Sequence, residues 1–380
     1  MRIAINTRLL IKNKLEGIGW FTYETLKRIV VNHPEHEYIF LFDRKPHPDF
    51  IFSNSVKPIV LRPQARHPFL WYIWFQYSVS HFLRKNKVDL FISPDGFIPT
   101  RCKTPTLNVI HDINFHHYPK GLPLLTRAYY QHFFPIFARK ATQIVTVSHY
   151  SKNDLINSYG IEPDKVSVVH NGANNIFGPI NDDLKIVVRQ RITNGAPYFV
   201  FVGALNPRKN VDRLIRSFDI FKQNTNDNHK LVIVGEPMFM TKSIEHTLKT
   251  MKHRDSVIFT GRLQIDELTQ VVASATALTF VPYFEGFGIP MVEAMYCHVP
   301  IIASNVTSMP EVAGDAAYYV DPFNENQIAE AMVQLVENSE LRAALTARAI
   351  ERKQLFSWDT SAHKLYQCIE GMTSTNGNNA

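Results

Sequence analysis

The chain has 380 residues, of which 45% are hydrophobic and 20% are charged, and its formal net charge is +7. This composition is typical of a soluble globular protein, and it excludes collagen-like, low-complexity and intrinsically disordered classes. A chain of this length is too long for one hydrophobic core, so we expect two domains.

The three cysteines are Cys102, Cys297 and Cys368. Their scattered positions match neither a disulfide framework nor the spacing of zinc ligands, so we expect no metal site built on them and a reducing, cytoplasmic location. The first residues, Met1–Asn6, are predicted to form a strand and are not a signal peptide. No run approaches the ~18 apolar residues that a membrane-spanning helix needs.

The charge is unevenly distributed. Residues 1–180 contain 22 Lys and Arg against 12 Asp and Glu, a balance of +10, whereas residues 181–380 contain 19 against 22, a balance of −3. The basic first half predicts an anionic partner, either a membrane surface or a phosphate-bearing acceptor. Nucleic acid is the alternative, but no helix-turn-helix, RRM or zinc-finger pattern supports it, and we expect no nucleic acid partner.

Short β-prone runs alternate with helical stretches along the whole chain, which predicts an α/β fold with parallel, doubly wound sheets in two Rossmann-like domains. The segment around 175–196 separates residues 1–180 from residues 196–356, a helix covers 357–372, and residues 373–380 are predicted to be a flexible tail. The predicted strands are 3–6, 38–42, 59–61, 90–93, 106–110 and 144–147 in the first half, and 198–202, 231–234, 257–259, 277–281, 300–303 and 317–320 in the second.

Ligands of such folds bind beyond the carboxyl ends of the strands. If the two domains face each other, the active site lies in the cleft between them.

The segment Glu285-Gly-Phe-Gly-Ile-Pro-Met-Val-Glu293 is the most informative part of the sequence. It joins a predicted strand to a predicted helix, and Pro290 suits the first helical turn. Glycines at 286 and 288 allow a ligand to approach the backbone closely, and the N–H groups of Phe287, Gly288 and Ile289 are expected at the helix N-terminus, where phosphate or hydroxyl oxygens accept them.

The two acids are what separates this segment from a plain phosphate site. Glu285 alone could be a helix-capping acid and Glu293 alone a solvated acid. Together they indicate a ligand with phosphates in the middle and hydroxyls on either side, which is the chemistry of a sugar nucleotide.

With its surroundings, the segment resembles the family 4 retaining glycosyltransferases, which have the GT-B fold. The similarity extends over nearly the whole chain, to the last helix near Trp358. Its other pieces are Gly17-Ile-Gly19, His111-Asp112, Val147-Ser148, His170-Asn171-Gly172, Phe201-Val-Gly203, Asn206-Pro-Arg208-Lys209-Asn210, Pro300-Ile-Ile-Ala-Ser304 and Pro310-Glu311-Val-Ala-Gly314.

The resemblance implies roles for residues of the second half. Arg208 and Lys209 lie at the start of a predicted helix and would hold the donor diphosphate. Arg208 would bind it through two parallel N–H donors, and Lys209 would act as a point charge. The alternative for this pair is a solvated basic loop. Glu285 would contact the transferred sugar and Glu293 the ribose, with Gly203 and the amides of Phe287, Gly288 and Ile289 completing the donor site.

In the first half, the resemblance singles out one histidine and two glycines. His111 ends a predicted strand at the mouth of the expected cleft, where it would contact the sugar; a structural histidine is the alternative, because the chain has 16. Gly17 and Gly19 are predicted in a loop between the first strand and the first helix, near the donor phosphates, with a plain tight turn as the alternative.

One residue departs from the family pattern. The family usually has glycine after the cysteine that ends the helix, and this chain has His298. A residue at this place normally adopts positive φ, which histidine tolerates poorly. We interpret the change as a local adjustment that leaves the donor site intact.

Residues 66–87 combine bulky aromatics with a basic end. The segment has the character of a membrane-surface helix. It equally fits a helix that packs its aromatic face on the first sheet, which is the interpretation we favour.

The resemblance implies a cytoplasmic, peripheral membrane enzyme that moves a glucose- or mannose-type hexosyl unit, with retention, from a UDP- or GDP-sugar to a saccharide or lipid-linked saccharide in surface polysaccharide assembly. The first domain would bind the acceptor and the second the nucleotide sugar, with no cofactor and no metal. The rivals are a sugar-nucleotide epimerase or hydrolase of the same fold, and a non-catalytic sugar-nucleotide-binding subunit.

Overall fold

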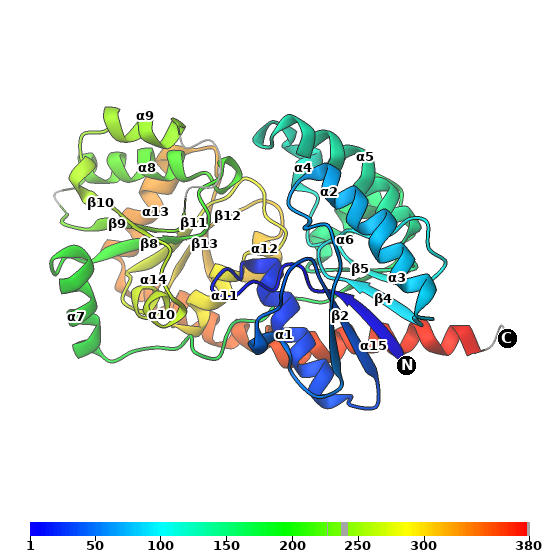
Figure 1. Ribbon diagram of the computed structural model, residues 1–380. Coiled ribbons are helices and arrows are strands. Elements are labelled where there is room, and N and C mark those ends of the chain that lie inside the picture. Colours follow the sequence, from blue (N-terminus) through cyan, green and yellow to red (C-terminus); the bar gives the residue numbers. More distant parts are fainter. Residues whose placement is uncertain (226, 237–241, 378–380) are drawn as a thin grey trace. The chain divides into compact units, whose positions relative to one another are not determined.

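The computed structural model describes residues 1–225, 227–236 and 242–377, the last five without side chains. The chain divides into two compact units (Figure 1). Unit 1 contains Met1–Gly172 together with the C-terminal segment from Trp358, and unit 2 contains Ala173–Ser357. In the described part of the chain, no helix is both long enough and apolar enough to cross a membrane.

Unit 1 is built on a seven-stranded sheet in the order β3-β2-β1-β4-β5-β6-β7, and every neighbouring pair is parallel. The central strands are almost wholly buried, because helices cover both faces of a parallel sheet. The strands are β1 (Arg2–Asn6), β2 (Glu37–Phe42), β3 (Val56–Val60), β4 (Leu90–Ser93), β5 (Thr106–Val109), β6 (Gln143–Thr146) and β7 (Val166–Val168).

The helices of unit 1 include one stretch of π-helix, η2 (Trp74–Val79), between α2 and α3. The last helix of the chain, α15, packs on α1. The helices are α1 (Gly17–Asn32), α2 (Pro68–Ile73), α3 (Ser80–Lys85), α4 (Asn114–His117), α5 (Leu124–Lys140), α6 (His149–Tyr159) and α15 (Trp358–Gly377), with short turns η1 (Pro48–Phe50), η3 (Pro119–Gly121) and η4 (Pro163–Lys165).

Helix α6 shows how the local sequence sets the ends of a helix. The Ser148 hydroxyl accepts a hydrogen bond from the backbone N–H of Ser151 at 3.0 Å, which caps the N-terminus. Gly160 ends the helix in the left-handed conformation, at φ 64°.

Unit 2 repeats the design with six parallel strands in the order β10-β9-β8-β11-β12-β13. The strands are β8 (Tyr198–Val202), β9 (Lys230–Val234), β10 (Val257–Gly261), β11 (Ala277–Phe280), β12 (Ile301–Ser304) and β13 (Ala317–Val320). The helices are α7 (Asp182–Thr193), α8 (Val211–Asn224), α9 (Lys242–Thr250), α10 (Ile265–Ala273), α11 (Ile289–Tyr296), α12 (Met309–Ala313), α13 (Glu325–Glu337) and α14 (Ser339–Arg352), with turns η5 (Pro207–Lys209), η6 (Arg254–Ser256) and η7 (Lys353–Leu355).

Each sheet has one point where the strand order reverses. In unit 1 the chain moves outward from β1 through β2 to β3 and returns to β4, and in unit 2 it moves from β8 through β9 to β10 and returns to β11. Ligands of such sheets bind beyond the carboxyl ends of the strands at the reversal. We therefore expect a site among the residues that follow β1, β4 and β5 in unit 1 and among those that follow β8 and β11 in unit 2.

The predicted α/β class with two doubly wound parallel sheets is confirmed. Strand β7, which has only three residues, was not predicted. Helix α15 runs to Gly377, so residues 373–377, predicted to begin a tail, are helical, while 378–380 lie outside the described residues.

Candidate active site

The turn after β11 has the predicted form of a strand-to-helix connection. Gly288 precedes α11 with φ at +89°, and Pro290 lies in the first turn of that helix. A Cβ at position 288 would lie 3.0 Å from the Met309 side chain and 3.1 Å from that of Met291. Both the backbone conformation and the surrounding space therefore favour glycine here.

Glu285 lies in this turn and pairs with two cations. An Arg208 guanidinium N–H donates to Glu285 Oε2 at 2.7 Å and to the Phe284 carbonyl at 3.2 Å, and the Lys209 ammonium pairs with the same Oε2. Arg208 and Lys209 are in η5, between β8 and α8, so the two strand ends on either side of the reversal supply one ion cluster.

The cluster decides the charge of Glu285. Burial alone would raise the pKa of this carboxyl, but the positive charges of Arg208 and Lys209 outweigh burial and lower the pKa to about 2. Glu285 is therefore a carboxylate throughout the physiological pH range. Lys209 is only 8% exposed and also lies 4.8 Å over the ring of Phe280.

Glu293 lies on α11, eight positions later, and has the opposite electrostatic setting. It is half-buried, and burial raises its pKa to about 8. No cation among the described residues offsets that burial. At neutral pH the carboxyl is mostly protonated and can donate a hydrogen bond as well as accept one.

The amides named by the sequence analysis lie where it placed them. Phe287 and Gly288 are buried and Ile289 is half-buried, and together they form the junction of the turn and α11. The Phe287 ring packs edge-on against Phe356 at 5.6 Å, which anchors the backbone that carries the first of these amides.

Gly203 follows β8 with φ at +150°, a backbone conformation that residues with side chains rarely adopt, and its carbonyl closely faces Gly235, which follows β9. A side chain at Gly235 would collide with the carbonyl oxygen of Gly203. The two strand ends can approach this closely because position 235 has no side chain, whereas at position 203 it is the positive φ that favours glycine. The sequence analysis named Gly203 but missed Gly235, although the Val-Gly ending that both strands share is a detectable signal.

Two further polar residues that were not predicted support the turn. The buried Asn210 amide donates to the carbonyls of Val281, at 3.0 Å, and Pro322, at 2.7 Å. The Ser308 hydroxyl donates to the Glu285 carbonyl at 2.8 Å. Asn210 is adjacent to Lys209 in the sequence, but its role as a brace depends on contacts with residues more than seventy positions away.

His298 confirms the expected backbone conformation, with φ at +58°. Its Nε2 lies 3.0 Å from the Lys353 ammonium. Burial and the Lys353 charge lower the pKa of His298, so the ring is neutral and accepts this hydrogen bond. The contact with Lys353 compensates in part for the strained position.

In unit 1, His111 follows β5 and lies beside Phe21 of α1, with ring centroids 5.1 Å apart in an edge-on arrangement. Its Nε2 is 3.0 Å from the carbonyl oxygen of Pro94. Burial lowers the pKa of His111, and the Pro94 carbonyl and the charges of Asp112 and Asp95 offset the effect only in part. The imidazole is therefore neutral at pH 7.

Next to His111, a buried polar network joins the ends of β1 and β4. Arg8 Nε donates to Asp95 Oδ2 at 2.6 Å, and the side-chain amide of Asn6 donates to Asp95 Oδ1 at 2.8 Å. Ser93 Oγ donates to the same Oδ1 at 3.1 Å, and the Arg8 guanidinium lies 4.6 Å over the ring of Phe97. This network was not predicted, because Asn6 and Arg8 on one side and Ser93 and Asp95 on the other are at least 85 positions apart in the chain.

The prediction of a glycine loop at Gly17 and Gly19 is wrong. Helix α1 begins at Gly17, so both glycines lie in its first turn, and the Trp20 N–H donates to the Glu16 carbonyl at 2.7 Å. Gly19 is buried, and a Cβ there would lie 3.1 Å from the Leu15 side chain. The Leu15 side chain leaves little room for a side chain at position 19, so the glycine there is explained by close packing inside a helix and not by a turn.

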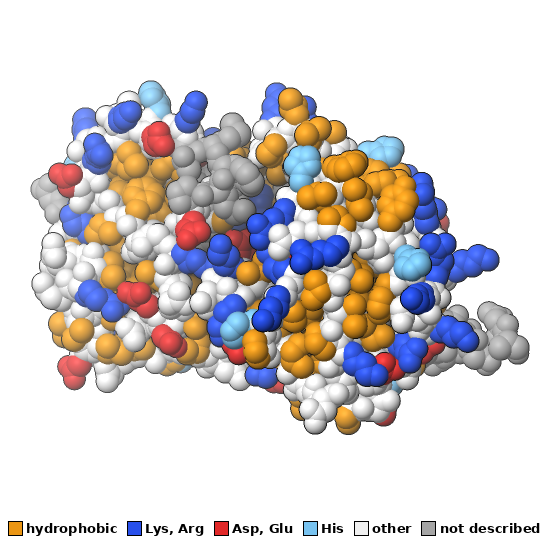
Figure 2. Space-filling model, viewed as in Figure 1, with side chains coloured by type: hydrophobic (Ala, Val, Ile, Leu, Met, Phe, Trp, Pro, Cys, Tyr) orange, Lys and Arg blue, Asp and Glu red, His pale blue; other side chains and the backbone are white. Residues whose placement is uncertain are grey.

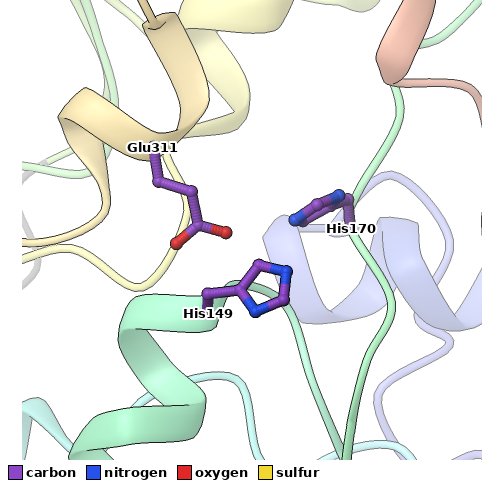
Figure 3. A group of neighbouring side chains, drawn as sticks. All are labelled: His149, His170 and Glu311. Atoms are coloured by element: carbon purple, nitrogen blue, oxygen red, sulfur yellow. The ribbon is translucent and has the colours of Figure 1, made fainter.

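Two other histidines of unit 1 lie at the carboxyl ends of neighbouring strands (Figure 3). His149 begins α6 after β6, and His170 follows β7; their ring centroids are 6.0 Å apart at 66°. Glu311, also drawn there, belongs to α12 of unit 2.

Two family models match the chain, one for most of each unit. "Glycosyltransferase Family 4" matches residues 16–175, and "Glycosyl transferases group 1" matches residues 183–352.

Curated relatives match over most of their length. O-antigen chain mannosyltransferase B of Escherichia coli is 26% identical over 363 residues, which are 92% of this chain and 94% of the relative. O-antigen chain mannosyltransferase RfbU of Salmonella typhimurium is 28% identical over 277 residues, which are 72% of this chain and 71% of the relative.

Solved structures share the fold at low identity. Sucrose-phosphate synthase from Thermosynechococcus elongatus has a TM-score of 0.77 at 17% identity, covering 98% of this chain and 99% of that one. WaaG, a glycosyltransferase involved in lipopolysaccharide biosynthesis, has a TM-score of 0.76 at 17% identity, covering 97% and 100%. The motifs, the two sheets and these matches agree: the chain belongs to the family 4 glycosyltransferases and has the GT-B fold.

Proposed function

We propose that this protein transfers a hexosyl unit, of the mannose or glucose type and with retention of configuration, from a GDP- or UDP-sugar to a saccharide or lipid-linked saccharide during surface polysaccharide assembly. The observation that carries the proposal is the cluster of Glu285 with Arg208 and Lys209 at the strand-order reversal of unit 2. The O-antigen mannosyltransferases among the relatives favour a mannose-type sugar.

Unit 2 would bind the donor. Arg208 pairs with Glu285 and the Phe284 carbonyl, and its planar guanidinium suits the two-point binding of a diphosphate. Lys209 adds a point charge, and the amides of Phe287, Gly288 and Ile289, with the backbone at Gly203, complete the phosphate and sugar contacts. Two cations and a helix N-terminus neutralise the leaving diphosphate, so the proposed reaction requires no metal.

The two glutamates would divide the donor between them. Glu285, held as a carboxylate, contacts the transferred sugar and stabilises the positive charge that develops at its anomeric carbon. Glu293, mostly protonated, suits the ribose hydroxyls, to which it can both donate and accept. We assign no protein nucleophile: the acceptor hydroxyl attacks from the face that the diphosphate leaves, and the departing phosphate oxygen takes its proton.

Unit 1 would bind the acceptor. The neutral ring of His111 would hydrogen-bond a hydroxyl of the transferred sugar near the reacting carbon. Gly17 and Gly19 remain proposed phosphate contacts, now from the first turn of α1, where the glycine at 17 is exposed and leaves the backbone accessible.

A donor panel is the first test. Each of the UDP-, GDP- and ADP-sugars is titrated while the melting temperature is followed, because a ligand that binds only the folded state stabilises it by RT ln(1 + [L]/Kd). A selective shift with one GDP- or UDP-sugar supports the proposal. The selected donor is then incubated alone: stoichiometric epimerisation or hydrolysis without acceptor favours the rival enzyme class, and binding without turnover on any acceptor favours the non-catalytic one.

We further propose that unit 1 meets an anionic membrane surface. Residues 61–140 contain 11 Lys and Arg and only three Asp and Glu, so this segment, at +8, exceeds the net charge of the whole chain, +7. The helical segments α2, η2, α3 and α5 contain no acidic residue at all.

The same helices expose apolar side chains. Leu124, Leu125, Phe69 and Tyr77 are 71%, 64%, 66% and 52% exposed, and Arg101 lies 5.6 Å over the Tyr77 ring. Figure 2 shows hydrophobic side chains gathered over α2, α3 and α5, with Lys and Arg around them. Exposed Leu and aromatic groups among cations are the composition of surfaces that insert at the headgroup level of anionic bilayers.

The other face of residues 66–87 packs on the first sheet, which is the interpretation favoured from the sequence. Trp74, Phe75, Val79 and Leu83 are buried in the core of unit 1. One face therefore packs against the sheet, as the favoured interpretation predicted, while Phe69 and Tyr77 remain exposed, and we propose that this second face meets the membrane.

Vesicle flotation tests this part of the proposal. We expect the wild type to float with vesicles that contain phosphatidylglycerol at low salt and to be released at high salt, since the attraction is ~1 kcal/mol per basic residue and decays over roughly 10 Å. Leu124→Ser/Leu125→Ser should float several-fold less. The matched control is Ile186→Ser/Val187→Ser, an equally exposed apolar pair on α7 of unit 2. Equal flotation of the two double variants would contradict the assignment to unit 1.

A further inference from the structure

Residues 94–97 form the turn that follows β4, and hydrogen bonds hold this turn from two sides. Asp95 binds it to the end of β1 through Arg8 and Asn6, and it also accepts a hydrogen bond from the Phe97 backbone N–H at 3.4 Å. On the other side, the buried Asn108 amide of β5 donates to the Gly96 carbonyl at 3.1 Å.

This turn presents one carbonyl oxygen to His111. The Pro94 oxygen lies 3.0 Å from His111 Nε2, and a carbonyl oxygen can only accept a hydrogen bond. In the neutral ring the proton must therefore be on Nε2, which leaves Nδ1 with the lone pair. A histidine with the proton on the other nitrogen would lose this bond and change from acceptor to donor at Nδ1.

We propose that Asp95 is a positioning residue for His111: by holding the 94–97 turn against β1, it places the Pro94 carbonyl so that His111 stays in the Nε2–H tautomer and offers Nδ1 as an acceptor to a substrate hydroxyl. This inference rests on the proposed role of His111 in the reaction. Asp95 itself need not contact any substrate, because it is only 7% exposed and its carboxylate is already bonded to Arg8, Asn6 and Ser93.

Asp43 provides a control of the same kind. It is fully buried at the end of β2, and its carboxylate pairs with Arg44 at 2.6 Å and accepts from the Ala65 N–H at 2.9 Å. Asp43→Asn thus removes a buried, arginine-paired charge from the same unit at a residue whose neighbour Ala65 also accepts from Arg8 at 3.4 Å, so it controls for a disturbance that reaches Arg8 without removing Asp95.

The experiment combines nitrogen NMR of the histidine rings with steady-state kinetics, using the full chain. The ring signals of His111 are assigned by their loss in His111→Asn, and the shifts of Nδ1 and Nε2 report which nitrogen carries the proton. The wild type and Asp43→Asn should show a single Nε2–H form. Asp95→Asn should show a mixture of tautomers and a kcat reduced about tenfold to a hundredfold, the size expected when a reacting group is misplaced.

The single variant leaves the Arg8 charge buried without its partner and can fail to fold. Arg8→Met/Asp95→Asn, which removes both charges, then carries the same measurement. An unchanged His111 tautomer in the variants that fold overturns the inference, whatever happens to kcat. A changed tautomer with an unchanged kcat supports Asp95 as a positioning residue and instead refutes the proposed role of His111 in the reaction.

Discussion

Glu285 and Glu293 are eight positions apart in one segment of unit 2, yet their surroundings give them opposite charges at neutral pH. Glu285, in the turn, is a carboxylate because Arg208 and Lys209 lower its pKa to about 2. Glu293, on α11, is mostly protonated because burial raises its pKa to about 8.

The cations make the difference, and they come from elsewhere in the sequence. Burial raises both pKa values, but only the turn faces η5, which connects β8 to α8. Two glutamates of one motif can therefore differ in their chemistry: one acts by its charge and the other by hydrogen bonds. The difference comes from residues outside the motif.

Removing both cations should have the largest effect. Replacing Arg208 and Lys209 with Ala should weaken nucleoside diphosphate binding by about 3–6 kcal/mol, because each charge-assisted bond contributes about 1.5–3 kcal/mol. Isothermal titration calorimetry measures the affinity. Unchanged affinity would remove both residues from the donor site.

The same double variant leaves the largely buried Glu285 carboxylate without its two cations. Its free energy of unfolding should therefore also fall by about 3–5 kcal/mol. Adding Glu285→Gln is the control, since it removes the stranded charge. We expect the triple variant to regain stability but not nucleotide affinity, which separates folding from binding.

Single replacements of the two acids should separate their roles. Glu285→Ala should lower kcat by about a hundredfold with a modest change in the donor KM, as expected for a contact that strengthens when charge develops on the sugar. Glu293→Ala should chiefly raise the donor KM, by about tenfold, as expected for a lost ribose contact worth ~1.4 kcal/mol. The same change in kcat and KM for both variants would contradict the division.

The raised pKa of Glu293 also predicts a pH-dependent stability. As pH rises above 4.5, the ordinary pKa of a glutamate, the unfolded chain releases this proton while the folded protein keeps it up to about pH 8, so the contribution of Glu293 to stability falls across that window. Compared with Glu293→Gln, the wild type should lose about 3–4 kcal/mol between pH 5 and pH 8, because the change approaches about 1.4 kcal/mol per pH unit across this window.

Urea unfolding of both proteins at several pH values measures this difference. Parallel stability curves for the wild type and Glu293→Gln would show that the carboxyl ionises normally. Glu293 would then be a carboxylate at neutral pH, as Glu285 is.

The smallest expected effect concerns metal ions. Because Arg208, Lys209 and the start of α11 are available to neutralise a diphosphate, turnover should be unchanged within about twofold in excess EDTA. Full loss of activity that Mg²⁺ or Mn²⁺ restores would show that these groups are not sufficient for the leaving group.

The strands and the motif segment could be predicted from the sequence because their signals are local. The strand at 198–202 is a continuous buried apolar run that is predicted to the residue, and positive φ at His298 follows from one position in a helix ending. Where the signal was short or ambiguous, prediction failed: β7 has only three residues, and α1 already begins at Gly17, where two glycines had indicated a loop.

By itself, the sequence determined the α/β class, the two parallel sheets, the family and some of the residues that gather at the strand ends, among them Arg208, Lys209 and Glu285. Only the tertiary structure decided the protonation of those residues, because a pKa depends on burial and on charges brought close by folding. The pairing of Glu285 with Arg208 and Lys209, and of Asp95 with Arg8, joins positions 76 to 87 residues apart. Residues this distant in the chain become neighbours only because parallel strands place their carboxyl ends along one edge of a sheet.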